Sequence, residues 1–317
     1  MSPDEMPKVP RIDAAVLSDP GHPDHADVAA EVALAAQGVG FLTVYNTGLS
    51  AAEVGAVIET YRRFFHLPAA QKEAVNMART GSNRGWGAPG SEQVDPDANP
   101  DYKQFFDCGF ELAVDDPIHR EKLGCYAPNL WPDTPAQFAD VVQRYYARTA
   151  EISLGLLGGI AGAIGEDRTY FADKFDRPMA LLRGNFYPER PPWAGDKDFG
   201  IATHTDYGCL TFLATDGSPG LEVRVRGGGW IPISAPVGEF VINFGEMLEI
   251  WTNGRIKATP HRVVGTKDER ISVPMFFNPN HDTNVAPMGS GETLLAVDHM
   301  TQRFDETYVH LQNAKDG

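Results

Sequence analysis

Leu181-Leu-Arg-Gly-Asn-Phe-Tyr187 begins a series of short apolar segments that continues to Ile271-Ser-Val-Pro-Met-Phe-Phe277. These segments are rich in β-branched and aromatic residues, and turns such as Asp216-Gly-Ser-Pro-Gly220 separate them. Many short strands at close spacing favour a β-sandwich or barrel over alternating strands and helices. The strands that we expect are 181–187, 210–214, 220–225, 230–233, 240–243 and 271–277.

The segments on either side of this β core favour helices. Helical spacing of apolar residues predicts helices at 24–37, 51–66, 134–165 and 301–312. Ser50 can cap the second of these, with Glu53 three residues further on. Short strands are expected at 9–16, 41–45 and 105–110, and a long irregular loop at 81–100, which is rich in Gly, Pro, Asn and Asp.

The 317 residues contain no segment that resembles a linker between domains. We therefore predict a single structural unit, 1–317, that is mainly β with flanking helices. Its expected parts are a mostly helical N-terminal part with a few strands at 1–179, the β core at 180–285 and a C-terminal helical segment at 286–317.

The composition is that of an ordinary globular protein, with 42% hydrophobic and 22% charged residues. A formal net charge of −16 argues against nucleic acid as a partner, because that binding depends on Lys and Arg. It also argues against an anionic membrane surface. The partner that we expect is a small-molecule substrate, and the oligomeric state is not predicted.

The cysteine content indicates a reducing compartment. Cys108, Cys125 and Cys209 are the three cysteines, and no Cys-x-x-Cys pair occurs. An odd count in a long chain argues against a disulfide framework and favours reduced thiols. The N-terminus is acidic and poor in apolar residues, unlike a secretory signal. The sequence predicts a cytoplasmic protein.

A His-x-Asp pair occurs three times, and its context distinguishes the third. The pairs at 22–24 and 25–27 lie in a stretch rich in Pro, Gly, Asp and His, which favours solvated loop histidines. His204-Thr-Asp206 precedes the apolar run 209–214. In extended backbone, residues i and i+2 point to the same side, so His204 and Asp206 can reach one ion.

His261 is the candidate third ligand, and several short strands fit between it and Asp206. Taken alone, a core histidine bonded to backbone is the simpler interpretation. Two imidazoles and one carboxylate are, however, the set that holds Fe(II) on one face and leaves the opposite positions open. The three residues together predict an iron centre that activates O₂.

Arg270-Ile-Ser272 follows the third candidate ligand. On a strand these two side chains face the same way, and a guanidinium fork with a hydroxyl suits the far carboxylate of a 2-oxo acid. The simpler alternative for Arg270 is a weak surface ion pair with Glu269 or Asp268. The apolar strand that follows favours the inward position.

Several segments, in this order and at this spacing, resemble the isopenicillin N synthase-like branch of the Fe(II)/2-oxoglutarate dioxygenases. They are Leu182-Arg-Gly-Asn-Phe-Tyr-Pro188, His204-Thr-Asp-Tyr-Gly208, Gly245-Glu-Met-Leu-Glu-Ile-Trp-Thr-Asn-Gly-Arg255, Pro260-His-Arg-Val-Val264, Glu269-Arg-Ile-Ser-Val273 and Phe276-Phe-Asn-Pro279. Gly38-Val-Gly-Phe-Leu-Thr-Val-Tyr-Asn46 is similar to the N-terminal segment of that family. The resemblance covers most of the chain and is densest between about 180 and 280.

The resemblance implies a double-stranded β-helix, or jelly roll, that uses Fe(II), 2-oxoglutarate and O₂. The residues that it implies are His204, Asp206 and His261 for the metal, and Arg270, Ser272, Tyr187 and Asn185 for 2-oxoglutarate. The implied activity is oxidation of a small molecule with release of succinate and CO₂. Hydroxylation is the default outcome, and desaturation or cyclisation would use the same machinery.

Substrate contacts are expected from Phe276, which strand alternation places on the face of the Arg-x-Ser pair. Trp86, Phe105 and Asp107 are further candidates, although for Trp86 a role in packing its loop explains the residue equally well. Two alternatives stay open. One is an iron oxidase of the same fold that does not use 2-oxoglutarate, and the other is a non-catalytic jelly-roll binding module.

Overall fold

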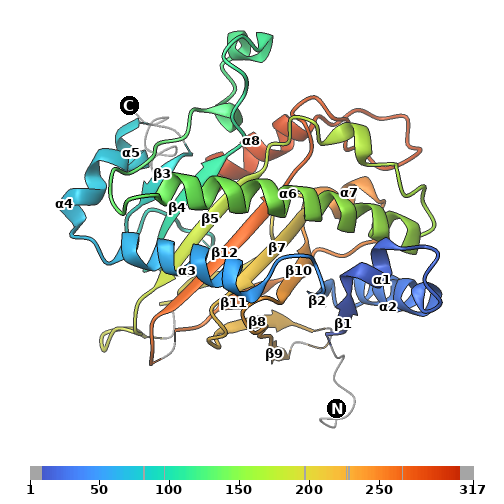
Figure 1. The fold of residues 1–317 in the computed structure, drawn as a ribbon, viewed down its shortest axis with the longest axis horizontal. Coiled ribbons are helices and arrows are strands. Elements are labelled where there is room, and N and C mark those ends of the chain that lie inside the picture. Colours follow the sequence, from blue (N-terminus) through green and yellow to red (C-terminus); the bar gives the residue numbers. More distant parts are fainter. Residues whose placement is uncertain are drawn as a thin grey trace.

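The computed structural model describes residues 9–307 except 81, 82, 96, 196, 197, 226, 228 and 266. Its centre is an eight-stranded sheet packed against a smaller, four-stranded sheet (Figure 1). The strands are β1 (Arg11–Asp13), β2 (Phe41–Tyr45), β3 (Gly85–Gly87), β4 (Gln104–Gly109), β5 (Leu181–Tyr187), β6 (Ile201–His204), β7 (Leu210–Thr215), β8 (Leu221–Arg224), β9 (Trp230–Pro232), β10 (Phe240–Phe244), β11 (His261–Val263) and β12 (Arg270–Phe277).

The order of the large sheet is β1-β2-β10-β7-β12-β5-β4-β3, and that of the small sheet is β6-β11-β8-β9. Neighbouring strands are antiparallel except for the parallel pair β1 and β2. Two antiparallel sheets packed face to face make a jelly roll, or double-stranded β-helix, with flanking helices. The predicted fold class is confirmed.

The helices lie outside this core. They are α1 (Ala14–Ser18), α2 (His25–Gln37), α3 (Ala51–Phe65), α4 (Ala69–Lys72), α5 (Met77–Thr80), α6 (Phe138–Ala163), α7 (Glu246–Trp251) and α8 (Ala296–Thr307), with short 3-10 turns at Glu73–Val75, Pro117–Glu121, Gly124–Tyr126 and Ala172–Lys174. In Figure 1, α3 and α6 run across one face of the large sheet, and both contact β12.

The central strands of the large sheet are covered on both faces, which explains their nearly continuous apolar sequences. Every residue of β5, β7 and β10 is buried. One face packs beneath the helices, where Phe64 of α3 meets the rings of Phe106 and Phe138. The opposite face packs against the small sheet, where side chains such as Leu213 and Val223 share a second core. The polar residues described below lie in this inter-sheet layer.

The predicted capping of α3 is confirmed. The Ser50 hydroxyl accepts a hydrogen bond of 3.2 Å from the Glu53 backbone, and the Glu53 carboxylate accepts one of 2.9 Å from the Ser50 backbone. This reciprocal pair satisfies two amides that the first helical turn leaves without partners. Helix α3 therefore starts at Ala51, and its aromatic stripe is aligned with the sheet.

Several predicted boundaries were wrong. The strand expected at 9–16 is only β1, because the Asp13 carboxylate accepts hydrogen bonds from the backbone of Ala15 and Val16 and starts α1. The irregular loop expected at 81–100 contains β3. The helix expected at 134–165 is α6, which begins at Phe138 and ends at Ala163.

The C-terminal helix begins earlier than its sequence pattern indicated. It was expected at 301–312, but α8 starts at Ala296, and residues 308–312 lie outside the described residues. Residues 1–179 also contribute more to the β core than predicted, because β1 to β4 all join the large sheet. Periodicity can indicate a strand, but it does not show which distant strand will pair with it, because pairing joins residues far apart in sequence.

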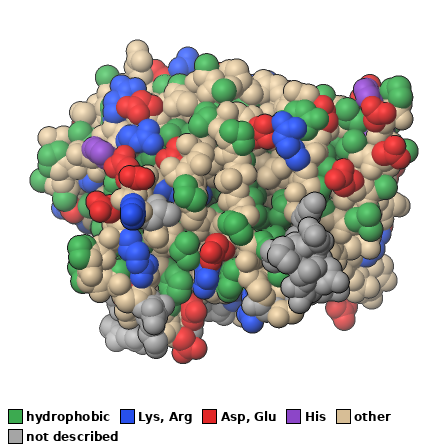
Figure 2. Space-filling model, turned by 90° about the horizontal axis from the view of Figure 1, so that it is seen from below, with side chains coloured by type: hydrophobic (Ala, Val, Ile, Leu, Met, Phe, Trp, Pro, Cys, Tyr) green, Lys and Arg blue, Asp and Glu red, His purple; other side chains and the backbone are tan. Residues whose placement is uncertain are grey.

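The described surface carries charged side chains of both signs (Figure 2). On the face drawn in Figure 2, the Lys and Arg side chains of the described residues lie among Asp and Glu side chains and form no continuous basic area. None of the helices in the described part of the chain combines the length and the apolar character needed to cross a bilayer.

Candidate active site

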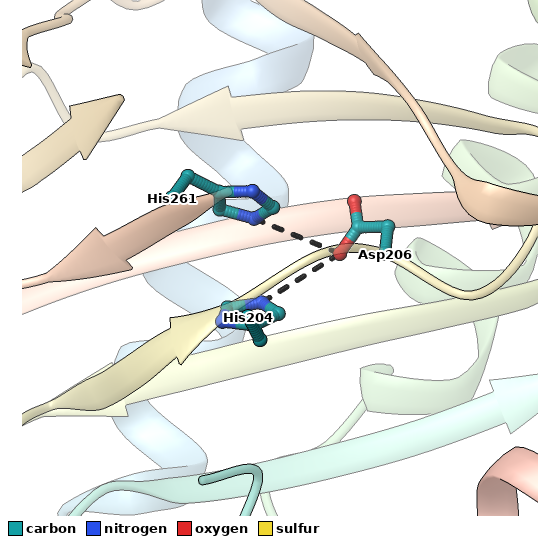
Figure 3. Close-up of side chains that lie close together, drawn as sticks. All are labelled: His204, Asp206 and His261. Carbon is teal, nitrogen blue, oxygen red and sulfur yellow. Dashed lines mark ion pairs between the residues drawn. The ribbon is translucent and has the colours of Figure 1, made fainter. Parts of the chain in front are cut away.

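His204 and His261 are direct neighbours across two paired strands. His204 ends β6, His261 begins β11, and the two residues are register partners. Their ring centroids lie 4.3 Å apart. Asp206 lies two residues beyond the end of β6, in the loop that leads to β7. The loop turns the carboxylate back toward both imidazoles (Figure 3).

The three side chains converge on one point. Oδ1 of Asp206 lies 3.7 Å from Nε2 of His204 and 3.6 Å from Nε2 of His261 (Figure 3). All three potential ligand atoms lie within 4.8 Å of one another. Among the residues that the structure describes, this is the one group of three or more His, Cys, Asp or Glu side chains that could hold a metal ion. Two nitrogens and one oxygen at such separations fit the facial ligand set of a non-haem Fe(II) ion.

Backbone carbonyl groups orient both imidazoles. Nδ1 of His204 donates a hydrogen bond of 2.8 Å to the carbonyl oxygen of Ala202, and Nδ1 of His261 donates one of 3.1 Å to that of Thr259. A carbonyl can only accept, so each ring carries its proton on Nδ1 and presents the Nε2 lone pair to the shared point. Burial, followed by the proximity of His261, lowers the pKa of His204, which favours the neutral form that a metal requires.

Two hydrogen bonds hold the second oxygen of Asp206. Oδ2 accepts from the hydroxyl of Thr211 and, at 2.6 Å, from the amide of Asn243. Burial alone would raise the pKa of Asp206, but the two nearby imidazoles and these hydrogen bonds lower it below the ordinary value. The carboxylate is therefore ionised and directs Oδ1 toward the histidines. Thr211 and Asn243 were not predicted from the sequence, although a polar residue within a buried apolar strand was a usable signal.

The residues predicted to hold 2-oxoglutarate lie opposite one another on two neighbouring strands. Arg270 pairs with Tyr187, and Ser272 pairs with Asn185, across the β12–β5 ladder. All four side chains line one cavity between the sheets, and the three candidate metal ligands line the same cavity. The structure therefore brings the predicted anchor and the predicted metal ligands together around a single space.

Arg270 is buried without an anion among the described residues. It is only 3% exposed, and its Nε and Nη1 atoms have no hydrogen-bond partner. Its guanidinium lies 5.0 Å from the ring centre of Tyr187. The surface-pair alternative is wrong for Glu269, whose carboxylate pairs instead with Arg62 and His66. A buried guanidinium that lacks a counter-ion is costly, so the cavity end fits an incoming carboxylate.

The four predicted substrate residues divide into two groups. Phe276 lines the cavity with Arg270 and Ser272, as strand alternation requires. The other three do not line either cavity at the metal ligands. Trp86 is a core residue whose Nε1 donates a hydrogen bond of 3.1 Å to the Gln104 side chain.

Phe105 and Asp107 support another side chain instead of facing the cavity. The guanidinium of Arg183 lies 4.1 Å from the ring centre of Phe105. Asp107 accepts two hydrogen bonds of 2.7 Å from the same guanidinium. Both residues thus act on the site through Arg183, which does line a cavity beside His204 and Asp206.

This second cavity lies on the α8 side of the metal ligands. Besides the predicted His204, Asp206, Asn185 and Phe276, it is lined by residues that were not predicted to contact a ligand: Glu92, Val94, Leu181, Arg183, Ile201, Thr205, Tyr207, Gly208, Asn278, Met300 and Phe304. For Arg183, the alternation of β5 was a usable signal, because Arg183, Asn185 and Tyr187 share one face. Glu92 and the α8 residues carried no comparable signal.

The chain matches two family descriptions and many known proteins. Residues 9–134 match the N-terminal part of the non-haem dioxygenases in morphine synthesis, and residues 178–279 match the 2OG-Fe(II) oxygenase superfamily. A 2-oxoglutarate-dependent dioxygenase of Didymella fabae is 30% identical over 92% of this chain and 94% of its own length. Homoarginine-6-hydroxylase of Arabidopsis thaliana is 32% identical over 83% of this chain and 80% of its own length.

A solved structure agrees with these relatives. A full-length protein of Neurospora crassa, in complex with alpha-KG (2-oxoglutarate), superposes with a TM-score of 0.83 at 26% identity, over 94% of this chain and 96% of its own. The two alternatives that the sequence left open, an oxidase independent of 2-oxoglutarate and a non-catalytic binding module, are set aside by these relatives. The chain belongs to the isopenicillin N synthase-like family of Fe(II)/2-oxoglutarate oxygenases and is a 2-oxoglutarate-dependent dioxygenase.

Proposed function

We propose that His204, Asp206 and His261 bind Fe(II) and that Arg270 and Ser272 bind the distal carboxylate of 2-oxoglutarate. The observation that carries this proposal is the single cavity that both sets of side chains line, with the unpaired guanidinium of Arg270 in its wall. When bound, iron and 2-oxoglutarate would activate O₂, which would oxidise the substrate and convert 2-oxoglutarate to succinate and CO₂.

The residues of this chain position the bound molecules and keep the site dry. Arg270 can offer two N–H groups to one carboxylate, which orients the co-substrate along the cavity toward the metal ligands. Tyr187 packs against the guanidinium, and Asn185 holds Ser272 through a hydrogen bond of 3.4 Å. Apolar residues between these groups, such as Leu213 and Val263, exclude water from the chemistry.

The substrate that is to be oxidised binds in the second cavity, on the α8 side of His204 and Asp206. Phe276 lines both cavities, so it lies where substrate and co-substrate would meet. Hydroxylation is the product class that we propose, with desaturation or cyclisation as alternatives that the same site allows. A cytoplasmic location remains a prediction, compatible with the three free cysteines.

The test is conversion of 2-oxoglutarate to succinate by the Fe(II)-loaded protein with a panel of small molecules. Wild type should form succinate, and His204→Ala and Asp206→Ala should abolish it. Product masses then separate a gain of one oxygen from a loss of two hydrogens. Wild-type Fe(II) affinity in both alanine variants would contradict the metal assignment.

A further inference from the structure

Five charged side chains form a buried cluster beside the substrate cavity. Arg183 belongs to β5 and Asp107 to β4, while Glu92, Asp101 and Lys103 lie in the segment between β3 and β4. All five are less than 10% exposed. Only Glu92 and Arg183 of this charged cluster line the cavity.

Two of the carboxylates each face one cation. Asp107 makes a two-bonded pair with Arg183, with both distances 2.7 Å. Asp101 lies 3.4 Å from Nζ of Lys103 and also accepts a hydrogen bond of 3.2 Å from the backbone of Ala202, in the strand that ends at His204. These contacts join the charged cluster to the metal-bearing strand.

Glu92 is the third carboxylate and has no cation of its own. It shares Arg183 with Asp107, at 2.8 and 3.0 Å, and shares Lys103 with Asp101. Three carboxylates thus share two cations within this cluster, and a third buried cation, Arg84, lies on the Asp107 side, where its charge opposes the rise that burial causes in the pKa of Asp107. Glu92 is the carboxylate of the charged cluster that lines the cavity, so its oxygens face the substrate space.

The carboxylate of Glu92 has room for another donor. Its Oε1 accepts from Arg183 alone among the described residues, whereas a carboxylate oxygen can accept two hydrogen bonds. Burial would raise the pKa of Glu92, but Arg183 and Lys103 lower it to about 2, so the group is ionised at neutral pH.

The metal and co-substrate sites would add no net charge beside Glu92. One positive charge on Arg270 and two on Fe(II) equal the one negative charge of Asp206 and the two of 2-oxoglutarate. The other walls of the substrate cavity are largely apolar and include Leu181, Met300 and Phe304. A cationic donor of the substrate would therefore find its acceptor in Glu92, whereas an anionic group would be repelled by this carboxylate.

We propose that the substrate carries a cationic hydrogen-bond donor, an amine or a guanidine, which Glu92 binds while the carbon chain lies along the apolar wall. This inference rests on the proposed function, because it requires the Fe(II) and 2-oxoglutarate sites to lie next to this cavity. It assigns Glu92 as the residue that selects substrate charge.

The test uses the wild-type protein loaded with Fe(II) and 2-oxoglutarate in the absence of O₂. Calorimetry measures the binding of three probes of equal carbon number: pentylammonium, pentanol and pentanoate. Pentylammonium should bind at least about tenfold more tightly than pentanol, and pentanoate should bind more weakly than both. Equal affinities, or tightest binding of pentanoate, would overturn the inference.

Glu92→Gln removes the charge at nearly constant size and should reduce the preference for pentylammonium over pentanol to less than about threefold. Glu222→Gln is the matched control, because Glu222 forms a similar pair with Arg262 on the small sheet and does not line the cavity. This control should keep the wild-type preference. A preference for pentylammonium that survives in folded Glu92→Gln would overturn the role of Glu92. If that variant does not fold, the order of affinities of the three probes for wild type tests the proposed substrate charge.

The same samples separate failure of this inference from failure of the proposed function. Binding of 2-oxoglutarate to the Fe(II)-loaded protein is measured before any probe is added. Loss of that binding in wild type would refute the assignment of the active site, and the inference would fall with it. Normal 2-oxoglutarate binding without a preference for the cation would refute only the substrate class.

Discussion

The side-chain amide of Asn243 donates a hydrogen bond of 2.6 Å to Oδ2 of Asp206, the oxygen that points away from the two histidines. Asn243 lies on β10 of the large sheet, whereas both histidines belong to the small sheet. The Asp206 carboxylate thus bridges the two sheets. Its orientation toward the metal position depends on a residue that would not touch the ion.

Asn243→Ala should weaken Fe(II) binding by about 10- to 100-fold, because partners of this kind orient metal ligands. Calorimetric titration with Fe(II) in the absence of O₂ gives the affinity, and urea unfolding of the apo protein shows whether the fold is intact. An intact variant that binds Fe(II) as tightly as wild type would contradict the role of Asn243.

Thr211 offers a matched pair of variants for the same carboxylate. Thr211→Val keeps the shape but removes the hydroxyl that donates to Asp206, whereas Thr211→Ser keeps the hydroxyl. We expect Thr211→Val to lose about tenfold or more in Fe(II) affinity and Thr211→Ser to stay close to wild type. Equal losses in the two variants would indicate a packing effect of the missing or displaced methyl group instead.

Arg270→Ala should raise the dissociation constant of 2-oxoglutarate by about 30-fold or more, since loss of a buried charged partner costs about 2–5 kcal/mol. Arg270→Lys should recover little of this loss, because an ammonium cannot form the two-bonded fork. Fe(II) affinity should change little in both variants. Arg11→Ala is the control, because Arg11 forms an exposed ion pair with Glu239 and should leave 2-oxoglutarate binding unchanged.

Glu92 should make the protein sensitive to acid. Burial would raise its pKa, but Arg183 and Lys103 lower it from 4.5 to about 2, so the folded state binds the proton less readily than the unfolded chain. The stabilisation is complete above the unfolded pKa and is lost as pH falls from about 4.5 toward 2. The pKa difference corresponds to about 3 kcal/mol of unfolding free energy.

Urea unfolding at about pH 6 and about pH 3 measures this effect. The unfolding free energy of wild type should fall more steeply between the two pH values than that of Glu92→Gln, which has no proton to gain at this position. Parallel pH dependence in the two proteins would show that Glu92 does not contribute to acid unfolding.

Ser50→Ala should lower the unfolding free energy by about 1 kcal/mol, because it removes the capping box at the start of α3. Ser50→Asp should restore most of the stability, since aspartate is also a good N-cap. Neither change should alter 2-oxoglutarate affinity, because α3 lies outside the inter-sheet layer. Urea unfolding and calorimetry of both variants provide the comparison.

Local sequence patterns were sufficient for most strands of the large sheet and for the candidate ligand set, but not for β3 or β6. The strand expected at 181–187 matches β5, and the strand expected at 271–277 differs from β12 by a single residue. Alternation and turn residues are properties of neighbouring positions, so they can be read before the fold is known. The same alternation placed Phe276 on the cavity face with Arg270 and Ser272.

Only the tertiary structure decided which other residues surround the site. Trp86 was a candidate for the cavity but lies in the core, whereas Glu92, from the same loop, lines the cavity. Asn243 reaches Asp206 because β10 and the β6–β7 loop are brought together by the packing of the two sheets. Residue type and spacing are local, but the direction a loop side chain takes depends on contacts between segments distant in sequence. The sequence by itself therefore determined the residue types of the candidate centre, and the packing of the sheets determined its supporting residues and the charged side chains beside it.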